Sequence, residues 1–167
     1  KFHEAAGAKF GAFAGWNMPL TYPLGVLKEH LFCRQSAGLF DISHMKLFMV
    51  DGDAVDTVMA RACPVDPMAM EVGESKYTYL LNENVGMIDD LIVTRLSHTR
   101  FLIVANASRV DADFERLNQV ARQLDCSVIP LDRVMLALQG PQAANVLADA
   151  GIDGASLTFM RANELTG

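Results

Sequence analysis

The sequence predicts an α+β protein in which an antiparallel sheet is flanked by helices. Between about residues 75 and 106, strand-like apolar runs are separated by short polar segments, and short connections of this kind join antiparallel strands. Over residues 109–124, apolar side chains recur at helical spacing, which predicts an amphipathic helix. The 167 residues are enough for one well-formed core or for two small interleaved lobes.

Composition and charge exclude several classes of protein. The chain is 51% apolar and 20% charged, which excludes a disordered tail. Its net charge of −6 argues against a nucleic acid partner. We expect no membrane association, because no apolar run has the length that a bilayer requires. The three cysteines lack motif spacing and are an odd number, which is typical of buried thiols in a reducing compartment.

The N-terminal region is predicted to begin with a loop or strand and to continue into a helix. Three glycines spaced four apart in residues 7–15 indicate a backbone that is crowded by a neighbour. Pro19 and Pro23 keep the following residues extended. A helix is then expected over residues 24–37, and Gly38 is suited to end it.

From residue 46 the order of elements predicts a ferredoxin-like lobe. A strand over residues 46–50 leads into a helix, for which Asp51 or Asp53 is the expected N-cap. Three strands, the helix over 109–124 with Ser108 as its cap, and a strand over 127–130 follow. This is a split βαβ arrangement with one additional strand near residues 76–81.

The chain is therefore expected to hold two interleaved lobes. Residues 1–45 form the N-terminal part of the first lobe, and residues 46–131 form the ferredoxin-like lobe. Residues 132–167 return to the first lobe with a short strand and a helix. Because the chain begins at Lys1 and stops at Gly167 without a closing element, we expect it to be part of a longer protein in which the first lobe is completed.

The centre of the predicted sheet carries two adjacent carboxylates. Asp89 and Asp90 lie inside the apolar run of residues 86–93. Side chains alternate along a strand, so the two carboxylates point to opposite faces. A carboxylate on a buried face costs free energy unless it is paired or hydrogen-bonded. This pair therefore requires an explanation.

The next strand along the chain offers a partner for Asp90. If residues 96–100 form the loop of a hairpin, Arg95 faces Phe101 and Asp90 lies opposite Asn106. The interpretation without any function is an aspartate that is satisfied by turn or cap hydrogen bonds, and the residues alone favour it.

The preceding strand offers a second partner. With a four-residue loop, Tyr77 lies opposite Asp90, and with a five-residue loop Thr78 does. The first register gathers a phenol, a carboxylate and an amide into one row across three strands.

Other common chemistries are not indicated. The sequence has no glycine-rich phosphate-binding loop. The four histidines are scattered, without cysteine or carboxylate at metal-ligand spacing, so no metal site is expected. Ser43 and His44 are neighbours whose side chains would point apart on a strand, which argues against a nucleophile–base pair.

Several longer motifs run through nearly the whole chain. They are Gly7-Ala-Lys9, Phe13-Ala-Gly-Trp16, Met18-Pro19, Glu29-His30, Ala37-Gly-Leu-Phe-Asp-Ile-Ser-His-Met45, Gly86-Met-Ile-Asp-Asp-Leu-Ile-Val93, Val104-Ala-Asn106 and Leu138-Gln-Gly-Pro141. Together they resemble the start of the glycine cleavage system T-protein family, the aminomethyltransferases.

The resemblance implies an activity, a co-substrate and a partner. Members of that family transfer the methylene carbon of an aminomethyl group, carried on the lipoyl arm of the H-protein, to tetrahydrofolate, and release ammonia. The family's key aspartate corresponds to Asp90, which would be the catalytic residue. Its folate contacts correspond to Met45, Tyr77, Asp90, Val104 and Asn106. The resemblance also implies a cytoplasmic location in a bacterium or a mitochondrial matrix location in a eukaryote.

The chain departs from the family pattern at two places. Val85-Gly86 stands where the family often has two glycines, and Tyr79 lies close enough to Tyr77 to compete for the folate-facing position. The family's later Thr-Gly-Tyr-Thr-Gly-Glu segment, a folate-contacting arginine and a C-terminal domain are absent, so we expect the chain alone to be inactive. The alternatives are a non-catalytic folate-binding module of an iron–sulfur maintenance protein and the folate domain of a dimethylglycine or sarcosine oxidising enzyme.

Overall fold

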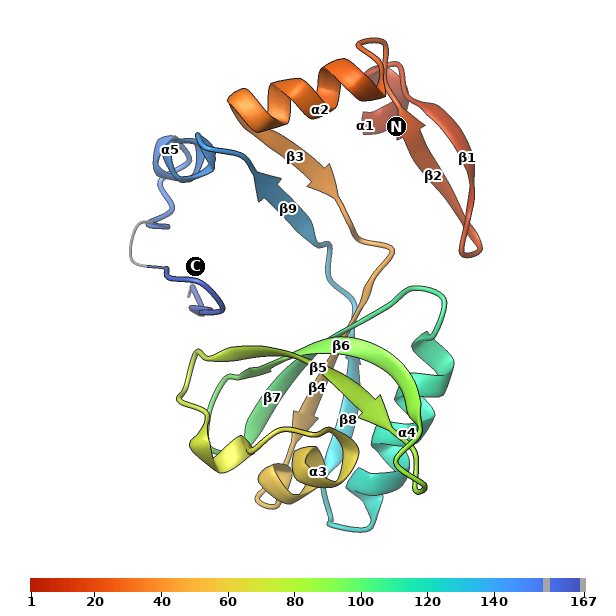
Figure 1. Ribbon diagram of the computed structural model, residues 1–167, viewed down its shortest axis with the longest axis vertical. Helices are drawn as coiled ribbons and strands as arrows, with labels where there is room; N and C mark the ends of the chain where they lie inside the picture. Colours follow the sequence, from red (N-terminus) through yellow and green to blue (C-terminus); the bar gives the residue numbers. More distant parts are fainter. Residues whose placement is uncertain (155–156, 166–167) are drawn as a thin grey trace. The chain divides into compact units, whose positions relative to one another are not determined.

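The computed structural model describes residues 1–154 and 157–165 (Figure 1). These residues divide into two compact units, one of residues 1–44 and 134–154, and one of residues 45–133 and 157–165. Both units combine antiparallel strands with helices. The predicted α+β fold class is therefore confirmed.

The first unit contains two small antiparallel ladders. Strand β1 pairs with β2, and β3 pairs with β9. The glycine-spaced segment is thus a strand, and the helix expected over residues 24–37 is α2. The elements are α1 (Phe2–Ala5), β1 (Lys9–Phe13), β2 (Trp16–Thr21), α2 (Val26–Gln35), β3 (Gly38–Asp41), β9 (Leu136–Gln139) and α5 (Ala143–Asp149).

The second unit is built on a five-stranded antiparallel sheet with the order β5-β6-β7-β4-β8. Strands β4, β6, β7 and β8, together with α3 and α4, give the ferredoxin-like arrangement, and β5 is the additional edge strand, as predicted. The elements are β4 (Lys46–Asp51), α3 (Val55–Ala62), a 3₁₀ turn η1 (Pro67–Ala69), β5 (Ser75–Leu81), β6 (Met87–Arg95), β7 (Arg100–Ala105), α4 (Val110–Arg122) and β8 (Ser127–Leu131).

The core of the second unit lies between α3, α4 and one face of the sheet. Every second strand residue points into it, so that Val50, Val93 and Phe101 are fully buried. Met59 from α3 and Leu117 from α4 pack into the same cluster. Burying a large apolar side chain stabilises a fold by about 1.5–3 kcal/mol relative to exposure. This cluster therefore fixes the strand phase on which the site depends.

The opposite face of this sheet, called here the second face, is also largely apolar. Its residues follow from the observed register, because residues directly opposite each other share a face. They include the apolar and aromatic residues Leu47, Met49, Tyr77, Tyr79, Ile92, Leu102, Val104 and Ile129, together with the polar residues Asp51, Ser75, Asp90, Thr94 and Arg100. Tyr77 is 58% exposed, so this face presents aromatic and apolar surface beside the Asp90 carboxylate.

Helix capping was predicted wrongly. Helix α3 begins after Ala54 and α4 after Arg109, and neither of these caps makes a side-chain hydrogen bond. Asp51 does not reach the helix because it belongs to β4, where it pairs with Arg100. The helices start where their apolar faces meet the core rather than at the best capping residue.

The final segment differs from the expected domain organisation. Residues 157–165 were expected in the first lobe as part of 132–167, but they group with the second unit. Ser75 N–H donates to Met160 C=O, and Ala162 N–H to Gly73 C=O, each at 2.8 Å. The chain before β5 has unpaired backbone groups, and this segment satisfies them. Residues 155–156 and 166–167 of the expected segment lie outside the described residues.

Candidate functional site

The two carboxylates of β6 point to different faces of the sheet. Asp89 shares its side with the buried residues Leu91 and Val93, whereas Asp90 lies on the second face with Ile92. Both aspartates are half-buried. Because half-buried carboxylates need hydrogen-bond or charge partners, the residues of the neighbouring strands determine the environment of both aspartates.

The register on one side of β6 agrees with the prediction and on the other side does not. Arg95 faces Phe101 as expected. On the other side, Tyr79 lies opposite Asp90, so the registers with Tyr77 or Thr78 in that place are wrong. The turn pairs Leu81 with Met87, as the five-residue loop predicts. An irregularity between Leu80 and Leu81 then shifts the register by one residue, so that Leu80 pairs with Asp89.

The structure nevertheless brings the expected groups together. The Tyr77 hydroxyl donates to Asp90 Oδ2 at 2.8 Å, because a tyrosine reaches its diagonal neighbour across a sheet. The Asn106 amide donates toward the backbone oxygen of Asp90 at 2.9 Å and lies 3.3 Å from Asp90 Oδ1. The same nitrogen is 3.2 Å and 3.3 Å from the two carboxylate oxygens of Asp89. A phenol, two carboxylates and an amide thus form one network.

The network has a defined polarity. The hydrogen bond to Asp90, followed by burial and the charges of Asp90 and Asp89, raises the pKa of Tyr77 above its usual value. The phenol therefore keeps its proton at neutral pH and donates to the carboxylate. Asp90 accepts hydrogen bonds and presents negative charge at the second face.

The other two expected contact residues lie near this network. Val104 pairs with Ile92 on one side and Leu47 on the other, on the second face. Met45 directly precedes β4, and β4 begins at the end of the sheet where Lys46 pairs with Ala105. Asn106 follows Ala105, so Met45 and Asn106 lie at the same end of the paired strands β4 and β7.

Sequence reasoning missed one member of this cluster. Asp113 of α4 is fully buried, and neither of its carboxylate oxygens has a hydrogen-bond partner among the described residues. Burial, followed by the charge and proximity of Asp89, raises the pKa of Asp113 to about 7. A signal was present, since Asp113 stands at helical spacing between Val110 and Leu117 on the apolar face of the helix.

A comparison with protein families identifies the fold. The family model described as the GCVT N-terminal domain matches residues 1–166. The chain belongs to this family. The resemblance seen in the sequence motifs is therefore confirmed.

Curated relatives of this GCVT N-terminal domain are longer proteins. An aminomethyltransferase of Deinococcus deserti is 36% identical over 147 residues, which are 87% of this chain and 41% of that protein. A probable aminomethyltransferase of Aeropyrum pernix is 39% identical over 154 residues, 89% of this chain and 41% of that protein. The chain thus spans about two-fifths of the length of the curated relatives it matches.

A solved structure agrees with this assignment. The crystal structure of the glycine cleavage system aminomethyltransferase T from Bartonella henselae is 61% identical, with a TM-score of 0.93, over 96% of this chain and 44% of that one. A heterotetrameric sarcosine oxidase from Corynebacterium sp. U-96 is 24% identical, with a TM-score of 0.50, over 68% of this chain and 55% of that one, and shows likeness of fold alone.

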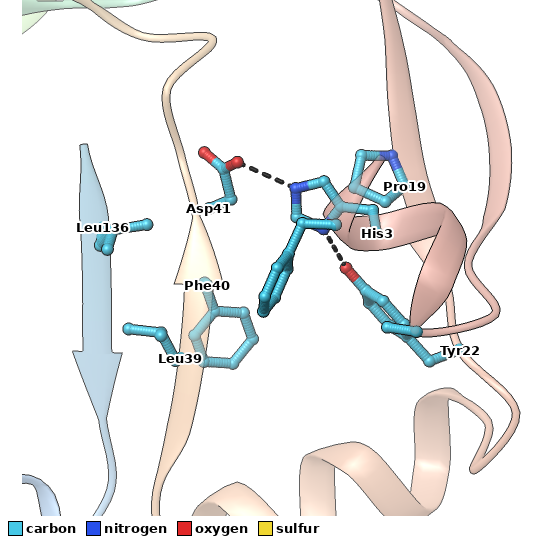
Figure 2. Close-up of a pocket in the computed structure, with 9 residues that line it drawn as sticks. His3, Pro19, Tyr22, Leu39, Phe40, Asp41 and Leu136 are labelled. Carbon is cyan, nitrogen blue, oxygen red and sulfur yellow. Dashed lines mark hydrogen bonds and ion pairs between the residues drawn. The ribbon is translucent and has the colours of Figure 1, made fainter. Parts of the chain in front are cut away.

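A second polar cluster of the GCVT N-terminal domain lines a cavity of about 530 Å³ in the first unit (Figure 2). His3 Nε2 donates to Asp41 Oδ2 at 2.9 Å, and the Tyr22 hydroxyl donates to His3 Nδ1 at 2.8 Å. Hydrogen bonds from Ser43, and then from His3, lower the pKa of Asp41 to about 2. With apolar walls from Phe40 and other residues, this cluster ties the start of the chain to β2 and β3.

Two features are absent from residues 1–154 and 157–165. Within these ranges, no helix combines the length and the apolar character needed to cross a membrane. The same residues contain no group of three or more histidine, cysteine or acidic side chains placed to hold a metal ion.

The departure at Val85-Gly86 has a structural consequence in this domain. Val85 adopts φ = 64° and is exposed. A β-branched residue in this left-handed region is strained by about 1–2 kcal/mol. We expect Val85→Gly to raise the free energy of unfolding by about 1 kcal/mol, because glycine removes this strain at the cost of some chain entropy. Urea denaturation measures the change.

The matched control is Val72→Gly, at an exposed turn valine that is not among the residues with positive φ. There glycine only loosens the unfolded chain, so stability should fall or stay unchanged. Equal effects at both positions would show that the turn at Val85 carries no strain.

Proposed function

We propose that this domain is the folate-binding part of an aminomethyltransferase of the glycine cleavage system. In the proposed reaction, the methylene carbon of an aminomethyl group on the lipoyl arm of the H-protein passes to tetrahydrofolate, and ammonia is released. The observation that carries the proposal is Asp90, a carboxylate held by Tyr77 and Asn106 on a largely apolar face.

The residues of the second face fit the chemistry of a folate. The pterin is a flat ring system whose edge carries N–H donors, and such ligands bind where apolar walls surround a few placed polar groups. Val104 and Tyr77 supply apolar and aromatic surface in this proposal. Met45 and Asn106 lie at the strand ends of the same sheet. The Asp90 carboxylate accepts hydrogen bonds from the pterin edge.

Asp90 also has a proposed role in the reaction. When a folate nitrogen attacks the methylene carbon, positive charge develops on that nitrogen. A fixed carboxylate beside it stabilises this charge, and more strongly where bound ligand excludes water. The hydrogen bonds from Tyr77 and Asn106 hold Asp90 in place before the reaction, so that no reorganisation is needed during it.

The proposal extends to partner and location. The partner is the lipoylated H-protein, and tetrahydrofolate is the co-substrate. Consistent with the bacterial relatives, the protein would act in the cytoplasm, or in the mitochondrial matrix if its source is eukaryotic.

The test is a transfer assay with the full-length protein. Aminomethyl-loaded H-protein and tetrahydrofolate should yield equal amounts of ammonia and methylenetetrahydrofolate, and omission of tetrahydrofolate should remove the folate product. Folate binding without ammonia release would instead support a non-catalytic module. Oxidation of sarcosine or dimethylglycine would support the folate domain of an amine-oxidising enzyme.

Residues 1–167 alone are expected to give no measurable transfer and to bind folate weakly. The family's later folate-contacting segments are not part of this sequence. Turnover by the purified chain with H-protein and tetrahydrofolate would contradict this expectation.

A further inference from the structure

Asp113 is a buried acid that the proposed reaction does not use. Its side chain has no exposed surface. The charged groups that act on it are Asp89 and Asp90 from β6 and Arg109 from the turn before α4. Helix α4 also packs on α3, β4 and β8, and none of the described residues of those elements is among the charges that act on Asp113.

The contact between Asp113 and Asp89 requires a proton. Asp89 is close enough to hydrogen-bond with Asp113, yet no described donor faces either oxygen of Asp113. Two ionised carboxylates only accept hydrogen bonds and repel each other. A shared proton turns this repulsion into a hydrogen bond, and the high pKa of Asp113, about 7, is consistent with that arrangement.

Asn106 connects this acid pair to the proposed site. Its amide nitrogen carries two hydrogens, but it lies within 3.3 Å of four acceptor oxygens, two on Asp89 and two on Asp90. The two aspartates therefore compete for the same donors. Another hydrogen-bond donor to Asp89 would therefore free the Asn106 N–H groups to donate to Asp90.

We propose that Asp113 is a positioning residue whose protonated carboxyl donates a hydrogen bond to Asp89 and thereby leaves the Asn106 amide to hold the Asp90 carboxylate. This inference rests on the proposed function for its effect on transfer, but the proton arrangement itself does not. When Asp113 loses its proton, Asp89 draws the amide away from Asp90. The proposed site is then less ordered and carries one more negative charge nearby.

The proton arrangement is tested first, without any folate or H-protein. Carbon-13 NMR of the aspartate carboxyl groups in this chain should show one carboxyl that titrates near pH 7 and is missing in Asp113→Asn. The Asp89 and Asp90 signals should shift over the same pH range in the original protein and not in the variant. Absence of a carboxyl that titrates between pH 6 and 8 would overturn the proposal. An Asp90 signal that does not shift over the pH range in which Asp113 titrates would also overturn it.

The effect on transfer is tested with two variants of the full-length protein. Asparagine at position 113 keeps a hydrogen-bond donor at every pH, whereas Asp113→Leu removes the donor. The ratio of the kcat of Asp113→Asn to that of the original protein should rise about tenfold between pH 6 and 8.5, because a hydrogen bond to a charged group contributes about 1.5 kcal/mol or more. Asp113→Leu should be impaired at both pH values.

The outcomes separate the two proposals. A constant ratio across this pH range, with both proteins folded and active, would show that Asp113 has only a structural role. A normal carboxyl titration in a protein that shows no transfer at all would contradict the proposed function and leave the shared proton standing. If Asp113→Leu does not fold, the asparagine variant and the NMR titration still decide.

Discussion

Asp90→Asn in the full-length protein is expected to lower kcat for aminomethyl transfer on the order of a hundredfold or more. The substitution keeps the shape of the side chain and removes its charge. Loss of one preorganised electrostatic partner typically has an effect of this size. Because the charge on the folate nitrogen develops only in the transition state, tetrahydrofolate affinity should change much less than the rate. Single-turnover kinetics and equilibrium folate binding measure the two quantities separately.

Two further substitutions serve as controls for Asp90. Asp111→Asn changes an exposed carboxylate of α4 and should leave transfer unaffected. Asp89→Asn should affect catalysis less than Asp90→Asn, since Asp89 points to the opposite side of the sheet. Equal losses at Asp89 and Asp90 would mean that the site is not on the second face. A changed thermal stability with intact kinetics would make Asp90 a structural residue.

Asp113→Asn is expected to change how stability depends on pH. The pKa of Asp113 is about 7 in the folded chain, against 3.8 for an ordinary aspartate. Below about pH 3 the group is protonated in both the folded and the unfolded chain, so its stabilising contribution is complete. As pH rises toward about 7, Asp113 ionises in the unfolded chain but stays protonated in the folded chain. The free energy of unfolding therefore falls. The loss amounts to as much as about 4 kcal/mol.

Asparagine does not titrate, so the variant should escape this loss. Urea denaturation between pH 4 and pH 8 should show the stability of Asp113→Asn relative to the original chain rising with pH over that window. The exposed Asp111→Asn serves as control and should reproduce the original pH dependence. Parallel curves for Asp113→Asn and the original chain would mean that Asp113 is ionised in the folded state at neutral pH.

The sequence by itself determined features that depend on local pattern. Alternation and helical spacing predicted the strands and helices of the second unit and their ferredoxin-like order. The hairpin of β6 and β7 placed Arg95 opposite Phe101, and its continuation brought Asp90 to Asn106. These were predictable because one strand face must be buried, which fixes register wherever a short loop joins two strands.

Only the tertiary structure decided the remaining features of the site. The β5–β6 register depends on an irregularity beside Leu81 that shifts Tyr79, not Tyr77, opposite Asp90. Helical spacing places Asp113 on the apolar face of α4, but only the packed structure buries it fully and sets it against Asp89. The burial of Asp113 and its electrostatic interaction with Asp89, 24 residues away, depend on tertiary packing. The local sequence pattern therefore does not predict how strong they are.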